Sequence, residues 1–494
     1  MSDYPRVSLA NPGNRIQDMG RRARIPSGLT TSHSLIGVNR ARPRDGLSRP
    51  CRVGMACMLA LLFWAGCGPE KPESPSTPTP PPSAQDRAEL TLLLTGQALS
   101  TLKPCGCSED QLGGLSRRQA ILNMIAPDRR LVIDTGGLLA ADSEQDRIKL
   151  EVFFQALTIL DYDLVHLDPE DYDVARQRGL VQAVLFDWIT SAPLAGPDPQ
   201  LRRWSRTLDL AGREVRVVVA AMRADAMTPR GLAEVFGPES AGPRLHVVIT
   251  PDEPPVEPGV VSQWSGVDLV IRPAAANEPQ VLHDGVAGPW VIAVGRLGEY
   301  IARVGVRWGA DNRPVFQFKE VAVDERLPED PLLVELYENY KLRVKEERLI
   351  DRMPQLPLPD NLEYVGSGTC KSCHEYEYER WATKKHARAY RTLVEINQQY
   401  DPECIACHVV GFGYVSGFRN ENSPTDLRDV GCEVCHGPGS AHVASQLAGG
   451  PYVAPGRPRL GCIDCHTPEH SVGYAGHEEE YLRKIVHWRE QKSP

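Results

Sequence analysis

The chain has no long block of basic residues, and its acidic residues outnumber its basic ones. The formal net charge of the 494 residues is −9, which argues against nucleic acid as a partner. No methionine follows Met353, so the C-terminal third has no thioether to offer a metal. The N-terminal apolar run 55–66 is shorter than the roughly 20 residues that a membrane-spanning helix needs.

That apolar run is typical of a secretory signal. Arginines precede it, and Ala65 and Gly66 stand directly before Cys67, as at a bacterial lipoprotein processing site. We therefore expect residues 1–67 to be a disordered N-terminus plus a signal segment, with a lipid on Cys67 that attaches the chain to a membrane. The alternative is a plain cleaved signal peptide. Residues 68–88 are rich in Pro, Ser and Thr and are predicted to be an extended linker. Both alternatives place the mature chain outside the cytoplasm, in the periplasm or cell envelope.

Strand and helix patterns alternate in residues 89–323, which predicts a layered α/β domain. Buried strands are expected at "AELTLLLTG", "RLVIDTGG", "DLVHL", "REVRVVVAAM", "RLHVVIT", "VDLVIRP" and "PWVIAVG", and a closing hairpin at "YIARVGVRW" and "PVFQFKEVAV". Amphipathic helices are expected at "GGLSRRQAILNMI" and "RIKLEVFFQALTILDY". Residues 324–361 are predicted to be a solvated helical linker.

The domain resembles the calcineurin-like metallophosphoesterases, and within them the 5′-nucleotidase branch. The matching words are "GGLSRR", "DTGG", the loop Asp168–Asp171 and "VDLVIRP". The resemblance implies a four-layer α/β sandwich whose active members hold two metal ions at the strand ends. Here Asp134 remains, but Gly137 occupies the next ligand position and "TGQALST" replaces an Asp-x-His pair. We expect phosphoesterase activity to be lost. Cys105 and Cys107 are open to either a metal-binding or a disulfide role.

Eight of the thirteen cysteines form four Cys-x-x-Cys-His motifs in the C-terminal third. The motifs are Cys370, Cys373 and His374; Cys404, Cys407 and His408; Cys432, Cys435 and His436; and Cys462, Cys465 and His466. This spacing is the attachment signature of c-type haem, because two thiols bond the haem edge and the next histidine binds the iron. A zinc site or a redox dithiol would not require a histidine after every pair.

Residues 362–494 are therefore predicted to be a tetrahaem cytochrome c domain in which the porphyrins supply most of the buried apolar surface. The second axial ligands must come from the remaining histidines: His386, His442, His470, His477 and His487. Bis-histidine ligation suits low-spin haems that transfer electrons.

Three segments of this domain resemble the cytochrome c-554 family: "GTCKSCHEYEYERWATKKHARAY", "CIACHVVGFGYVSGF" and "DVGCEVCHGPGSAH". The resemblance implies that His386 is the distal ligand of the third haem, on His436, and that His442 serves the first, on His374. It implies that His487 serves the fourth, on His466, with His477 or His470 as alternatives. The second haem, on His408, would lack a distal side chain.

The predicted fold class is α+β and multidomain, with the four-layer sandwich followed by a mostly helical and loop-rich multihaem domain. The predicted function is electron transfer between redox protein partners. Two enzyme alternatives stay open: a haem enzyme acting on a small nitrogen compound at the open second haem, and a nucleotidase with a fused redox domain. The sequence leaves the oligomeric state open.

Overall fold

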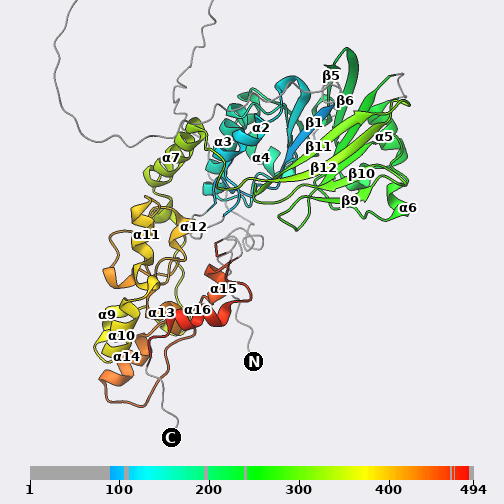
Figure 1. Ribbon diagram of the computed structural model, residues 1–494. Helices are drawn as coiled ribbons and strands as arrows, with labels where there is room; N and C mark the ends of the chain where they lie inside the picture. The colour runs from blue at the N-terminus through cyan, green and yellow to red at the C-terminus, as the bar shows by residue number, and fades with distance from the viewer. Residues whose placement is uncertain are drawn as a thin grey trace, which may run out of the picture. The chain divides into compact units, whose positions relative to one another are not determined.

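The computed structural model describes residues 89–104, 111–193, 199–237, 242–467, 470–471 and 473–488. Figure 1 shows the chain as a ribbon coloured from blue at the N-terminus to red at the C-terminus. The predicted signal segment, the linker 68–88, and Cys105 and Cys107 lie outside the described residues. In the part of the chain that is described, no helix combines the length and the apolar character needed to cross a bilayer.

Two six-stranded mixed sheets form the centre of the N-terminal part. The first has the order β12-β11-β1-β2-β3-β4, with parallel pairs from β1 to β4 and antiparallel pairs of β1 with β11 and of β11 with β12. Its strands are β1 (Leu90–Thr95), β2 (Arg130–Asp134), β3 (Leu164–Leu167), β4 (Asp187–Thr190), β11 (Tyr300–Trp308) and β12 (Pro314–Ala322).

The second sheet has the order β5-β6-β7-β8-β10-β9, parallel from β6 through β10 and antiparallel at both edges. Its strands are β5 (Arg203–Leu210), β6 (Arg213–Ala221), β7 (Arg244–Ile249), β8 (Leu269–Arg272), β9 (Gln280–Asp284) and β10 (Trp290–Ala293). The central strands of both sheets are continuous apolar runs, as expected of strands covered on both faces.

Three apolar clusters stack into a four-layer sandwich. One lies between the two sheets, one between the first sheet and its helices, and one between the second sheet and its helices. The helices of this part are α2 (Leu115–Leu122), α3 (Glu144–Ile159), α4 (Pro169–Gln177), α5 (Pro229–Phe236), α6 (Pro258–Val261), α7 (Pro331–Glu346) and α8 (Leu349–Arg352). The predicted fold class is thus confirmed for this part.

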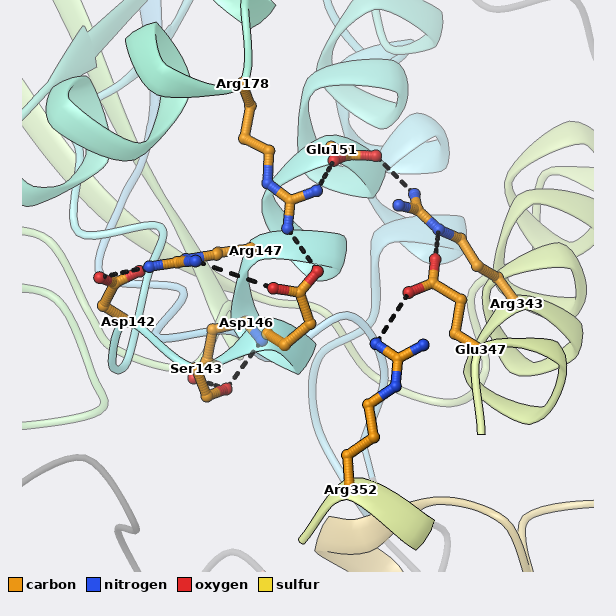
Figure 2. A network of polar contacts seen from close by, with 10 residues as sticks. Asp142, Ser143, Asp146, Arg147, Glu151, Arg178, Arg343, Glu347 and Arg352 are labelled. Carbon is orange, nitrogen blue, oxygen red and sulfur yellow. Dashed lines mark hydrogen bonds and ion pairs between the residues drawn. The ribbon is translucent and has the colours of Figure 1, made fainter. Parts of the chain in front are cut away.

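The linker helix was predicted to be exposed to solvent, and this prediction is wrong. Helix α7 forms, but Leu333, Tyr340 and Val344 are buried in the cluster that also contains α3. Figure 2 shows ion pairs that fasten it there, since the Glu151 carboxylate bridges Arg178 at 3.1 Å and Arg343 at 2.5 Å. The helix is therefore part of the sandwich.

Three strands, β4, β5 and β9, and three helices, α4, α5 and α6, were not predicted. Strand β5 alternates between buried and exposed positions, a weaker sequence signal than a buried run. Residues 169–171, predicted as loop, begin helix α4 because Asp168 accepts the Asp171 backbone N–H at 2.9 Å and proline follows it at the first helical position.

The C-terminal part consists of short helices joined by loops, as predicted. They are α9 (Ser367–Lys371), α10 (Glu375–Ala382), α11 (Ala389–Glu395), α12 (Pro402–Ile405), α13 (Cys432–His436), α14 (Ser440–Leu447), α15 (Cys462–Cys465) and α16 (Glu478–Ile485). A compact apolar cluster includes Ile405, Phe412 and Phe418. Tyr390 packs on Phe418 with ring centres 5.5 Å apart.

Candidate functional site

Each Cys-x-x-Cys-His motif lies on or beside a helical turn. Cys370 is in α9, Cys404 in α12, and both cysteines of the third and fourth motifs are in α13 and α15. Residues three apart share one face of a helix. The turn therefore points the two thiols of a motif to the same side.

Six histidines form three pairs with nearly equal separations. The ring centres are 6.3 Å apart for His374 and His442, 6.2 Å for His386 and His466, and 6.1 Å for His436 and His487. An imidazole nitrogen binds a metal ion at about 2 Å, so two rings on opposite sides of one ion have centres roughly 6 Å apart. The three pairs therefore fit the axial ligands of a predicted haem iron.

The partners within these pairs agree with one assignment implied by the family resemblance and differ from two. His442 faces His374, the pairing that the resemblance implies. His386 faces His466 and not His436, and His487 faces His436 and not His466. The two assignments implied by the family resemblance are thus exchanged.

The surroundings of His466 explain this exchange. The backbone of His386 lies beside the third motif, because the His386 carbonyl accepts the Val430 N–H at 3.0 Å. The His386 ring, however, faces His466 of the fourth motif. Helix α16 reaches the fourth motif through Tyr481, whose ring centre is 5.5 Å from that of His466. The end of the helix then brings His487 to the third motif.

Hydrogen bonds fix the orientation of several of these rings. In three of them Nδ1 donates to a backbone carbonyl. His408 donates to Ala389 at 2.6 Å, His442 to Val453 at 2.7 Å and His487 to Ile485 at 3.0 Å. A histidine that donates from one nitrogen is left with the other as a metal ligand. This tautomer makes Nε2 the available donor atom.

Burial also favours the neutral form, which ligation requires, in three of the four motif histidines. It lowers the pKa of His408, His436 and His466, and that of His386. The neighbouring His487 lowers the pKa of His436 further. The observed residues therefore fit the group that the motifs predict.

The second motif differs from the others. His408 is not a member of any of the three ring pairs above, although the neighbouring His470 contributes to its lowered pKa.

His477, an alternative ligand of the fourth motif, is 3.7 Å from the Glu480 carboxylate. The ring that faces His466 belongs to His386 instead.

The motifs also contact one another. A hydrogen bond between the Cys370 and Cys432 thiols lowers the pKa of Cys432 to about 7. A hydrogen bond between Cys407 and Cys465 lowers the pKa of Cys407. The first motif therefore lies against the third, and the second against the fourth.

Glu433, inside the third motif, joins it to the segment that precedes the first. Its side chain is 3% exposed and accepts the N–H groups of Val365 at 3.0 Å, Gly366 at 2.8 Å and Gly439 at 2.8 Å. The net effect of burial is to raise the pKa of Glu433. Sequence reasoning missed this residue, because a glutamate between two cysteines carries no signal of burial.

The strand ends of the sandwich carry polar residues that bond to one another. The buried Asp134 carboxylate accepts the Thr95 hydroxyl at 2.6 Å and the Gly136 N–H at 3.0 Å, and burial raises the pKa of Asp134. Asp171 accepts the N–H groups of Leu138 and Leu139, both at 3.0 Å.

Two further features oppose a metal centre there. Gly137 has φ +71°, and a side chain on it would collide with the Gln97 amide. The guanidinium of Arg118, 1% exposed, lies near Asp134. Among the described residues, no group of three or more His, Cys, Asp or Glu side chains could hold a metal ion. Neither Arg118 nor the buried His166 was singled out from sequence.

Comparison with known proteins covers both parts of the chain. The family model described as cytochrome c554 and c-prime matches residues 369–437. Cytochrome c-554 of Nitrosomonas europaea is 35% identical over 91 residues, which are 15% of this chain and 39% of that protein. The chain therefore matches well under half the length of this curated relative.

Solved structures resemble the N-terminal part. The 5′-nucleotidase precursor of Thermus thermophilus gives a TM-score of 0.42 at 14% identity, over 57% of this chain and 63% of that one. A calcineurin-like phosphoesterase of Bacillus subtilis gives 0.40 at 12% identity, over 53% and 98%. Residues 369–437 therefore match the cytochrome c554 and c-prime family model, in a chain whose N-terminal part is similar to the calcineurin-like phosphoesterases.

Proposed function

We propose that this protein is an extracytoplasmic multihaem c-type cytochrome that transfers electrons through four covalently bound haems. The observation that carries the proposal is the set of three histidine pairs at 6.1–6.3 Å, each containing one motif histidine. The family match to residues 369–437 supports it independently.

The chain supplies the attachment and the axial ligands. The eight motif cysteines would form the thioethers, and His374, His408, His436 and His466 would be the proximal ligands. His442, His386 and His487 would be the distal ligands of the first, fourth and third haems. When bound, haem iron supplies reversible one-electron redox chemistry.

The contacts between motifs suggest an order for the relay. The first motif touches the third and the second touches the fourth. Cys435 of the third motif lies near Cys462 of the fourth, since burial and the neighbouring Cys462 both raise the pKa of Cys435. These contacts give the order first, third, fourth, second. Redox proteins outside the cytoplasm would be the partners at its ends, and a lipid on Cys67 would keep the chain at the membrane.

A second candidate function concerns His408. Its Nδ1 is held by Ala389, yet it has no place in the three ring pairs. An iron on His408 with an open face would bind a small nitrogen compound. The corresponding experiment is addition of nitric oxide to the reduced protein, which would change the spectrum of one haem; unaltered low-spin spectra of all haems would contradict this candidate.

The sandwich is proposed to be without phosphoesterase activity, since its strand-end carboxylates accept hydrogen bonds from the chain itself. The decisive experiment for the whole proposal is haem quantification with a reduced-minus-oxidised spectrum. We expect four haems per chain, and no nucleotide hydrolysis with added Mn²⁺ or Zn²⁺. Fewer than four haems would contradict the electron-carrier proposal, and hydrolysis would contradict the inactive sandwich.

A further inference from the structure

A lysine of the sandwich lies against the second haem-binding motif. Lys149 is on α3, and its side chain is only 9% exposed. Its Nζ is 2.5 Å and 2.7 Å from the two carboxylate oxygens of Glu403. Glu403 directly precedes Cys404, the first cysteine of the motif. A buried ammonium without a partner is costly, so Lys149 depends on this carboxylate, whose own side chain is 47% exposed.

A hydrogen bond beside this ion pair holds the start of α12. The Gln145 amide, also on α3, donates to Asp401 at 2.8 Å. Asp401 caps α12 by accepting the Glu403 N–H at 2.9 Å. Gln145 and Asp401 are 6% and 7% exposed. The cap of the helix that carries Cys404 is thus fixed by a side chain of the sandwich.

Helix α7 contacts the segment that leads into α12. The Tyr337 hydroxyl accepts the Gln398 amide at 2.7 Å, and Lys341 donates to the Ile396 carbonyl at 3.1 Å. Glu151 of α3 is paired with Arg343 of α7 (Figure 2). The two helices are therefore joined to each other, and both contact the segment that carries the second motif.

We propose that α3 and α7 are the support of the second haem, and that Lys149 is a positioning residue that sets this haem's reduction potential through Glu403. The inference rests on the proposed function, since it takes the motif Cys404–His408 to carry a haem. Reduction makes the iron site less positive by one charge. A lone carboxylate nearby therefore opposes reduction and a lone ammonium favours it. In the native chain the Lys149 ammonium offsets the Glu403 carboxylate, and the carboxylates of Asp401 and Asp146 also act on it.

The sign of each variant follows from this. Lys149→Gln removes the ammonium that offsets the surrounding carboxylates of Glu403, Asp401 and Asp146 and should lower the potential of one haem. Glu403→Gln removes the carboxylate that contacts the ammonium directly and should raise the potential of the same haem. The double variant should return it towards the native value, and Lys149→Arg should preserve it. A contact that only supports folding would not give shifts of opposite sign.

The experiment is a potentiometric titration of the full-length holoprotein, followed by visible spectroscopy. Haem content is measured first, and His408→Met identifies the transition of the second haem. Lys319→Gln, on the exposed face of β12, is the matched control and should leave all transitions in place. If Lys149→Gln does not fold, the rise expected for Glu403→Gln still decides.

Two outcomes are distinguished. Four haems with single-variant shifts that are absent, equal in sign or spread over every haem would overturn the inference and leave the proposed function intact. A native chain without haem on the second motif would overturn the proposed function itself.

Discussion

At the residue scale, the histidines of the C-terminal part are held in place by the protein. His408, His442 and His487 each donate Nδ1 to a backbone carbonyl, which fixes both the tautomer and the direction of the ring. His442 follows His436 by six residues but is not paired with it. Its ring lies opposite His374, and the left-handed Gly437 (φ +83°) turns the chain away from His436.

Replacing His442 by alanine should therefore affect the first haem alone. We expect one haem of the four to change from low-spin to high-spin, because only its distal nitrogen is lost. Electron paramagnetic resonance of the oxidised protein measures this change. His477→Ala is the control, since that side chain is 62% exposed and faces Glu480. A change in two haems, or in none, would argue against the pairing.

At the element scale, the turn between α13 and α14 joins the third motif to His442. A side chain on Gly437 would collide with the Gly456 carbonyl, so only glycine fits. Glu433 at the other side of this turn accepts three backbone N–H groups from two separate segments. These contacts fix the third motif against the start of the domain.

Substituting Glu433 by glutamine should destabilise this arrangement by about 1–3 kcal/mol, the usual cost of leaving a buried polar group unsatisfied. An amide offers one acceptor oxygen and places its own N–H₂ against N–H donors. Guanidinium unfolding followed in the haem absorption band gives the value. Glu479→Gln, whose side chain is 94% exposed, should stay within experimental error of the native protein; equal losses in both variants would contradict the role of Glu433.

At the scale of the whole molecule, the two parts differ in what they bury. The sandwich has three apolar clusters, whereas the C-terminal part has a smaller one centred on residues such as Ile405 and Phe418. Many of the apolar side chains of this part are exposed, among them Leu447, Tyr452 and Ile463. The sandwich should therefore be the more independent of the cofactor.

Chain produced without haem should keep a folded sandwich and lose the fold of the C-terminal part. Limited proteolysis with mass spectrometry should give cuts concentrated after α7, with the sandwich intact. The haem-loaded chain, digested in parallel, should resist cleavage in both parts. Equal resistance of the C-terminal part in the two samples would show that the apolar cluster alone suffices to fold it.

Sequence reasoning succeeded where the signal is local. The buried runs of β1, β6 and β7 and the four motifs were identified because each is contiguous in the chain. The edge strand β5 was missed because only alternate residues are buried. The contact between Lys149 and Glu403 joins residues 254 positions apart, and no periodicity reports such a contact. The partners of His386 and His487 depend in the same way on how distant segments cross.

The crossing pattern of the histidine pairs has a consequence for the chain's entropy. Each pair joins segments roughly 50 to 80 residues apart, so an iron held between them would close a loop of that length, as a disulfide does, and restrict the unfolded chain by about 4 kcal/mol. The three loops overlap, since His386 and His436 both lie between His374 and His442. With haem bound at the proposed sites, the cofactors would act as cross-links that stabilise a domain otherwise made of short helices and loops.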